Sequence, residues 1–228
     1  MERIEEYRRI IQKILEAFTN VPFTVVVESA TGKTINPVNL NDPKDRELID
    51  DLKTIADNIL TEFFEKSITL GEYRKLGKKS AKTFRPNEVS VFLEHTFPKK
   101  FMEIKESLKT IVNVVHLKES GYPDEKIIDK YGRVTFLEIK ATTRPDSGSP
   151  RDFFFTPLGN TKKKVDSDGH HLLLGFVIEE ARPKTFRTIG WKLVDLSKIF
   201  VSMKPEFNTD NRELYKREAI ITENWIDS

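Results

Sequence analysis

The sequence feature that most constrains the fold is a change in apolar spacing near residue 121. Before this point, apolar residues recur mostly every three or four positions, which is the period of one face of a helix. After it, apolar and polar residues alternate over 126–129 and 133–141, with a Tyr131-Gly132 turn between them. Helices before and after a group of strands predict an α/β fold with a central mixed β-sheet flanked by helices.

The other segments follow from the same periods and from turn residues. Helices are predicted over 1–18, over 42–66 after an Asp42-Pro43 start signal, from Asn87, from Pro98 to about 119, near 196–203 and from about 211. Further strands are predicted over 22–28, 172–178 and 186–194. Residues 71–86 and 142–169 contain glycine or proline among polar residues and are predicted to be loops.

The chain as a whole has the composition of a water-soluble globular protein. It has 228 residues, 38% of them apolar and 32% charged, which predicts one domain over 1–228, with a helical part to about 120 and a catalytic sheet over about 121–195. The absence of cysteine excludes disulfides and thiolate metal sites. No apolar run can span a bilayer and the acidic start lacks a signal peptide, so a prokaryotic cytoplasmic location is expected.

Basic residues are concentrated in two segments, although the net charge is only +2. The first basic segment, residues 71–86, has six basic and one acidic side chain. The second basic segment, residues 140–164, has six basic and two acidic side chains. Two basic segments on an otherwise acidic chain indicate local contact with a polyanion, whereas either segment alone is as readily explained as a solvated loop.

Three side chains of the predicted hairpin can converge on one point. Glu138 and Lys140 are two positions apart on a strand and therefore project from the same face. Asp124 precedes the first strand of the hairpin and can lie beside the far end of the second. Two carboxylates are hard oxygen ligands that suit Mg²⁺, which polarises a phosphoryl group and acidifies a bound water. A neighbouring ammonium can orient that water or offset transition-state charge.

These residues resemble the PD-(D/E)XK nuclease motif of type II restriction endonucleases. Pro123-Asp124 followed by Glu138-Ile139-Lys140 has the order and spacing of that motif. The resemblance implies Mg²⁺-dependent hydrolysis of DNA phosphodiesters, with a restriction-endonuclease-like fold. It also implies that Asp124, Glu138 and the Ile139 carbonyl ligate metal and that Lys140 handles the water. Family members often add an acid from a preceding helix; Glu94 is the first choice here and Glu106 the alternative.

Several look-alike patterns do not carry the same weight. Glu103-Ile104-Lys105 has the letters of the triplet but lies in a helical pattern, where positions two apart do not share a face. The Ala30–Thr34 stretch ends like a phosphate-binding loop, but Val27 replaces the first glycine of that motif. His170 and His171 are adjacent on a strand and face opposite ways, so a shared metal is not expected. Phe153–Phe155 is predicted to anchor the long loop rather than to stack on bases.

Double-stranded DNA is the expected partner. Predicted contacts in the first basic segment are Arg74, Lys75, Lys78, Lys79, Lys82 and Arg85, and those after the catalytic strand are Thr142, Arg144, Ser149, Arg151, Lys162, Lys163 and Lys164. Arginine can bind guanine through two hydrogen bonds, so Arg144 and Arg151 are the candidates for base reading. A palindromic target would require two copies of the chain, and a homodimer is therefore expected.

Three functions remain open from the sequence. A type II restriction enzyme that cuts both strands at a short site is favoured, because the long segment after Lys140 suits base reading. A structure-selective repair nuclease or Holliday-junction resolvase would use the same motif. A non-catalytic DNA-binding module would not need to retain both acids and the lysine.

Overall fold

The structure is a computed structural model, and it describes residues 2–17, 19–78, 81–143, 153, 155–203, 212 and 216–218. The chain divides into two compact units, which are described separately. One unit is Pro22–Phe200 and contains the main sheet. The other consists of Met1–Val21 and Val201–Ser228. The prediction of a single domain over 1–228 stays a prediction.

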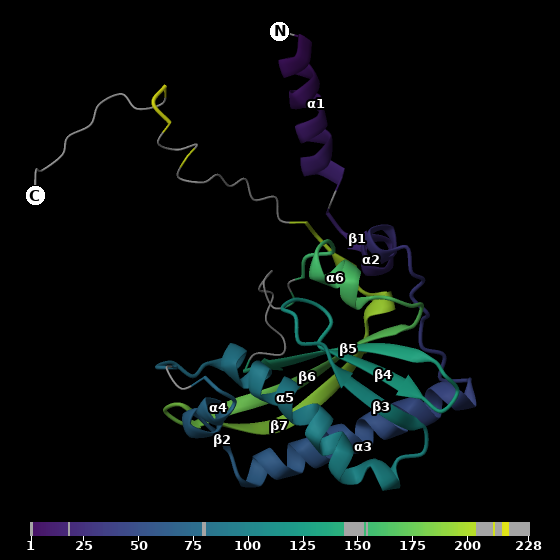
Figure 1. The fold of residues 1–228 in the computed structure, drawn as a ribbon, viewed down its shortest axis with the longest axis vertical. Coiled ribbons are helices and arrows are strands. Elements are labelled where there is room, and N and C mark those ends of the chain that lie inside the picture. The colour runs from purple at the N-terminus through teal and green to yellow at the C-terminus, as the bar shows by residue number, and fades with distance from the viewer. Residues whose placement is uncertain are drawn as a thin grey trace, which may run out of the picture. The chain divides into compact units, whose positions relative to one another are not determined.

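A six-stranded mixed sheet forms the centre of the larger unit (Figure 1). Its strand order is β2-β7-β6-β5-β4-β3, and only the β5–β6 pair is parallel. The strands are β2 (Ile68–Thr69), β3 (Ile111–His116), β4 (Glu125–Asp129), β5 (Val134–Thr142), β6 (His170–Arg182) and β7 (Thr185–Asp195). The predicted mixed sheet flanked by helices, and its β4–β5 hairpin, are confirmed.

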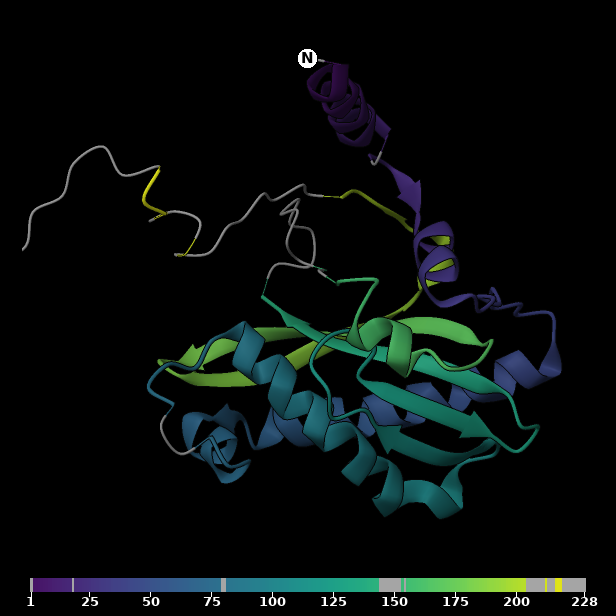
Figure 2. The ribbon, with the colours of Figure 1, turned by 45° about the horizontal axis from the view of Figure 1, so that its top comes forward.

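Two long helices cover one face of this sheet (Figure 2). They are α3 (Pro43–Glu65), which begins after the predicted Asp42 cap, and α5 (Pro86–Ile104). The main hydrophobic core lies between them and the sheet, and it contains alternate residues of β5 and β6 such as Leu137, Ile139 and Leu174. Because side chains alternate along a strand, Glu138 and Lys140 project from the opposite face.

The opposite face carries the short helices α2 (Phe23–Thr31) and α6 (Asn160–Lys164) (Figure 2). A cluster of aromatic rings packs there as well. Phe23 packs against Tyr122 and Phe155, with ring centroids 5.6 and 5.2 Å away. The Tyr122 hydroxyl and His171 Nδ1 share a 2.6 Å hydrogen bond. Phe153 stacks on Phe155, so these rings have the packing expected of an anchor for the segment after β5.

The predicted strand over 22–28 is wrong, because this segment forms α2. Phe23 and Val27 are four positions apart and both are fully buried, which places them on one helical face. Gly32 then ends the helix in the left-handed conformation, with φ of 70°. The β-branched run favoured a strand, but burial of one helical face outweighed that local preference.

The predicted helix from Pro98 to about 119 is also wrong. A single helix, α5, runs through Pro98 to Ile104 and is followed by a short 3-10 turn, η1 (Lys105–Ser107). The chain then forms β3, which pairs antiparallel with β4. In place of a loop over all of 71–86, the structure has α4 (Leu70–Lys75), capped by the Thr69 side chain. The predicted helix near 196–203 is a 3-10 turn, η2 (Leu196–Lys198), followed by β8 (Phe200–Val201).

The smaller unit contains α1 (Glu2–Ala17), which matches the helix predicted over 1–18. Several apolar side chains of α1 are exposed, among them Ile4, Tyr7 and Ile11. Nearly all of the helix predicted from about 211 lies outside the described residues. A separate two-stranded sheet pairs β1 (Val21–Pro22) with β8. Within the described ranges, no helix combines the length and apolar character needed to cross a membrane.

Candidate active site

Asp124 lies at the point where the β4–β5 pairing ends. Its N–H donates to the Leu137 carbonyl at 3.0 Å, and its Oδ2 accepts the N–H of Ile139 at 2.8 Å. A side-chain carboxylate thus accepts from the next free N–H of β5, where a neighbouring strand would offer a backbone carbonyl. This hydrogen bond fixes the Asp124 carboxylate beside Glu138 and Lys140.

Glu138 and Lys140 occupy the same face of β5, as their spacing predicts. Lys140 Nζ lies 2.5 Å from Glu138 Oε1, and the Glu138 side chain is only 3% exposed. The other carboxylate oxygen, Oε2, is buried and has no hydrogen-bond partner in the part of the chain that the structure describes. Glu138 is therefore a buried acid with one paired and one unpaired oxygen.

Glu94 joins this group from α5. Ser90 and Glu94 are four positions apart and share a face of the helix, and Ser90 Oγ accepts the N–H of Ala141 at 2.7 Å. That hydrogen bond ties the helix to β5 one residue beyond Lys140. Asp124, Lys140 and Glu138 all act electrostatically on the Glu94 carboxyl. Glu106, the alternative choice, lies instead in η1 and is exposed.

Burial makes the three carboxyls hold protons more tightly than ordinary acids, and repulsion by Asp124 adds to this for Glu94 and Glu138. Burial, with the charge of Asp124, raises the pKa of Glu94 to about 8. The same two causes raise the pKa of Glu138 to about 7, against the opposing effect of Lys140. Burial also raises the pKa of Asp124. Burial lowers the pKa of Lys140, but Glu138, Asp124 and Glu94 together raise it above its ordinary value and keep the ammonium charged. Such a site gains from a bound cation.

The donor set fits Mg²⁺ better than a metal that needs a complete protein cage. Among the residues described, no three His, Asp or Glu side chains are close enough to enclose a metal by themselves. Mg²⁺ commonly takes only one or two carboxylates and completes its shell with water and substrate oxygens. The unpaired Glu138 Oε2 and the carboxylate of Asp124 are donors of this kind.

A histidine–carboxylate pair next to the site was not anticipated from the sequence. His116 Nδ1 on β3 lies 2.8 Å from Glu125 Oε1 on β4, and the Glu125 side chain is fully buried. The hydrogen bond with Glu125 raises the pKa of His116, while burial raises the pKa of Glu125 to about 7. The sequence did offer one signal for this pair. The run of β-branched residues over 111–115 is typical of a strand, and a strand there places His116 next to β4.

The predicted DNA contacts differ in exposure and in their partners within the protein. Lys78, Lys82, Arg85, Lys162 and Lys163 are exposed, as phosphate contacts require. Arg74 donates two hydrogen bonds to the Ala81 carbonyl and Lys75 pairs with Glu72, although both are also exposed. Lys164 is only 5% exposed. Thr142 ends β5, next to the site, whereas Lys79, Arg144, Ser149 and Arg151 lie outside the described residues.

Other polar groups singled out in the sequence have structural partners. His170 lies 3.4 Å from Asp45 and 2.9 Å from the Asn36 carbonyl, whereas His171 bonds to Tyr122, so the two rings face opposite ways as expected.

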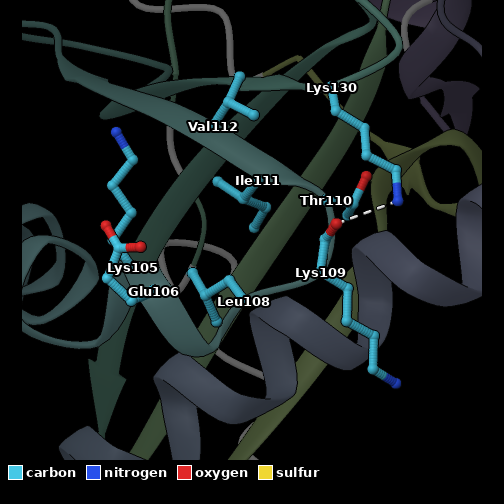
Figure 3. A pocket seen from close by; sticks show the side chains of 8 residues that line it. All are labelled: Lys105, Glu106, Leu108, Lys109, Thr110, Ile111, Val112 and Lys130. Atoms are coloured by element: carbon cyan, nitrogen blue, oxygen red, sulfur yellow. Dashed lines mark hydrogen bonds between the residues drawn. The ribbon is translucent and has the colours of Figure 1, made fainter.

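A cavity of about 190 Å³ lies beside β3 and is lined by Lys105, Glu106, Thr110 and Lys130 among others (Figure 3). Glu106 is the one carboxylate in its lining, which includes neither Asp124 nor Glu138.

Comparisons with known proteins agree with this geometry. A family model described as "Type II restriction enzyme MjaV family" matches residues 17–218. The chain belongs to the type II restriction enzyme MjaV family. It is 31% identical over 226 residues to the type II restriction enzyme MjaV of Methanocaldococcus jannaschii, covering 96% of this chain and 95% of that protein. No solved structure matches.

Membership of the MjaV family identifies the activity. The protein is a type II restriction endonuclease, a site-specific endodeoxyribonuclease whose substrate is DNA. Type II restriction enzymes generally need a divalent metal ion, and the resemblance to restriction endonucleases drawn from Asp124, Glu138 and Lys140 is confirmed at the level of the family.

Proposed function

We propose that this MjaV-family endonuclease cuts double-stranded DNA with Mg²⁺ held by Asp124 and Glu138, with Lys140 as the third catalytic residue. The observation that carries the proposal is the convergence of two buried carboxyls and an ammonium at the end of the β4–β5 pairing. The raised pKa values of Glu138 and Asp124 support it, because strongly perturbed groups of this kind are typical of functional sites.

Each side chain has a distinct role. Asp124 is held by the Ile139 N–H through Oδ2, which leaves its other oxygen for the metal. Glu138 offers Oε2, the atom that lacks a protein partner among the described residues. Because no three described carboxylates are close enough to enclose a metal directly, Glu94 would act on the same ion through a bound water, and the Ile139 carbonyl would be a further oxygen. Bound Mg²⁺ would polarise the phosphoryl group and lower the pKa of the attacking water.

Lys140 supplies the positive charge that the protein itself brings to the reaction. Its ammonium lies 2.5 Å from Glu138 Oε1. It stays protonated, because Glu138, Asp124 and Glu94 together raise its pKa against the opposing effect of burial. From that position it can orient a water by hydrogen bonding and stabilise the negative charge that builds up on the phosphoryl oxygens. We therefore assign Lys140 to orientation and charge stabilisation.

DNA would be held by exposed basic side chains on both sides of the catalytic strand. The first basic segment would follow one stretch of the DNA phosphate backbone. Its contacts would be Lys78, Lys82 and Arg85, with Arg74 and Lys75 of α4 and with Lys79. Lys162 and Lys163 of α6 would contact phosphates nearer the cut. Arg144 and Arg151 remain the candidates for reading bases, and Thr142 and Ser149 would be further DNA contacts after the catalytic strand. We propose a homodimer, because a palindromic site presents two equivalent strands.

Cleavage assays on plasmid and phage DNA test the proposed centre. Asp124→Ala and Lys140→Ala should each reduce the single-turnover cleavage rate by at least about 100-fold, because each removes a group that stabilises the transition state. EDTA should abolish wild-type cleavage and added Mg²⁺ should restore it. Melting temperatures would show that the variants remain folded.

Lys105→Ala is the matched control, because Glu103-Ile104-Lys105 has the same letters as the catalytic triplet but lies at the end of α5. This variant should cut at the wild-type rate. Full activity of Asp124→Ala or Lys140→Ala would refute the site. Cutting only at junctions or flaps would favour a resolvase-like enzyme, and binding without cutting would favour a DNA-binding module.

A further inference from the structure

The loop that leads into Asp124 is held from outside the hairpin by three contacts from one short segment. Asn160 Nδ2 on α6 donates to the Ser120 carbonyl at 3.0 Å. Lys164 Nζ, at the end of α6, donates to the carbonyls of Gly121 and of Pro123, the latter at 2.7 Å. Residues 160–164 therefore bind the backbone of residues 120–123, which ends at the catalytic aspartate.

A fourth contact fixes the other side of Asp124. Lys126 Nζ on β4 lies 2.7 Å from both carboxylate oxygens of Asp166, two residues after Lys164. Asp124 is thus bracketed by contacts before and after it in the sequence, all from residues 160–166. The segment that makes them joins β5, which carries Glu138 and Lys140, to β6.

Lys164 is unusual among the lysines of α6, because its side chain is buried while Lys162 and Lys163 are exposed. Burial lowers the pKa of the Lys164 ammonium, and the charges of Asp124 and Glu138 act in the opposite direction. A buried charge is costly unless it has hydrogen-bonding partners, and here the partners are two backbone carbonyls. The Lys164 ammonium is therefore hydrogen-bonded to the loop before Asp124 and is largely shielded from solvent.

We propose that Lys164 is a positioning residue: it holds the Gly121–Pro123 backbone so that the Asp124 carboxylate is correctly placed for the metal. The proposal rests on the proposed function, since it requires Asp124 to be a metal ligand. This role takes the place of the DNA-phosphate contact predicted for Lys164 from the sequence, because a buried ammonium is poorly placed to reach a phosphate. Groups that orient metal ligands commonly change metal affinity by 10–100-fold when they are removed.

The test is a Mg²⁺ titration of single-turnover cleavage on a plasmid that the wild-type enzyme cuts. Lys164→Met keeps the aliphatic stem but removes the ammonium. The Mg²⁺ concentration for half-maximal rate should rise about 10–100-fold. The rate at saturating Mg²⁺ should fall about 10-fold or more, because small misplacement of a reacting group is costly. DNA affinity in EDTA, and its dependence on salt, should stay at wild-type values.

Three further variants separate positioning from general stability. Lys100→Met removes another partly buried lysine, which pairs with Glu62 and Glu103, and it should lower the melting temperature without changing the Mg²⁺ requirement. Asn160→Ala removes only the Ser120 contact and should raise the Mg²⁺ requirement by a smaller factor. Lys164→Arg keeps the charge and the donors and should recover part of the wild-type Mg²⁺ response.

Several results would overturn the proposal. Weaker DNA binding with a salt dependence reduced by about one counterion, and an unchanged rate at saturating DNA, would make Lys164 a phosphate contact. A lower melting temperature with a wild-type Mg²⁺ requirement would make its role structural only. If Lys164→Met does not fold, Asn160→Ala decides, and an unchanged Mg²⁺ requirement in that variant overturns the proposal. Full activity of Asp124→Ala would contradict the proposed function. If Asp124→Ala is inactive but Lys164→Met has a wild-type rate and Mg²⁺ requirement, only the inference about Lys164 is contradicted.

Discussion

At the scale of single residues, two buried carboxylates, Asp51 and Glu138, differ in how many hydrogen bonds they accept. Asp51 on α3 is 2% exposed and accepts hydrogen bonds from three successive backbone N–H groups, those of Lys109, Thr110 and Ile111. Glu138 is equally buried, but its Oε2 lacks a hydrogen bond within the described chain and its pKa is raised to about 7. The first arrangement stabilises the fold, whereas the second costs stability and leaves an oxygen for chemistry.

Glu138→Gln should therefore stabilise the metal-free protein at alkaline pH while abolishing cleavage. Because the pKa of Glu138 is raised in the folded state, the protonated Glu138 side chain contributes to the free energy of unfolding. That contribution is fully present below the ordinary pKa of 4.5 and is lost as the pH rises through about 7. The substitution removes that loss and should add about 1–3 kcal/mol at pH 8 but little at pH 5. Urea denaturation in EDTA at both pH values measures the difference.

Asp51→Asn is the matched control for that experiment. It replaces a well-bonded buried carboxylate by an amide that cannot accept all three N–H groups equally, so it should destabilise the protein at both pH values. Equal destabilisation of Glu138→Gln and Asp51→Asn at pH 8 would contradict the view that Glu138 is held in the fold at a cost.

At the scale of elements, the parallel pairing of β5 with β6 depends on a close approach at Gly169. This glycine precedes β6, and a Cβ built on it would lie 2.4 Å from the Val134 carbonyl oxygen at the start of β5. Its carbonyl also accepts the N–H of Asn36, and its own N–H donates to the Thr34 carbonyl. The register that aligns Glu138 with Leu173 begins at this contact, with Thr135 opposite His170.

Gly169→Ala should destabilise the protein by about 2–4 kcal/mol, because the added methyl group meets rigid backbone that must shift. Chemical denaturation gives the free energy of unfolding. The cleavage rate of the folded fraction should also fall, because β5, which carries the proposed catalytic residues Glu138 and Lys140, would shift. Gly190→Ala in β7 is the control: nothing lies within 4 Å of its added Cβ, so its effect should stay within about 1 kcal/mol. Similar losses in both variants would argue against a specific close approach.

At the scale of the whole molecule, charge is distributed unevenly, although the net charge is only +2. Exposed basic residues of the first basic segment and of α6 lie in stretches of high local charge, while the rest of the chain is acidic in sum. DNA binding should therefore depend steeply on salt, because each neutralised phosphate releases about one counterion. Net charge alone would not predict this behaviour.

The combined substitution Lys82→Gln and Arg85→Gln should lower the log–log slope of DNA affinity against salt by about two, with a similar loss on all sequences. Filter binding in EDTA between about 50 and 200 mM salt measures the slope. Lys53→Gln on α3 removes an exposed lysine from outside the basic segments and should leave the slope unchanged. An unchanged slope in the double variant would place the DNA elsewhere on the protein.

The features that the sequence alone determined are local ones. The β4–β5 hairpin follows from alternation over 126–141 and from Gly132, which adopts φ of 75° at the turn. Projection of Glu138 and Lys140 from one face follows from the same two-residue period. The start of α3 at Asp42-Pro43 follows from capping. Each depends on interactions between residues close in sequence, so a period or a cap is sufficient to predict it.

Tertiary structure decided whatever depends on packing between distant segments. Phe23 and Val27 form a helix because their shared face is buried, and residues 111–116 form a strand because β4 pairs with them. Ser90 fastens α5, which carries Glu94, to β5 across 51 positions of sequence, and Lys164 reaches the Asp124 loop across 43 and 41 positions. No local period encodes such contacts, because the burial that stabilises them exists only once the chain has folded.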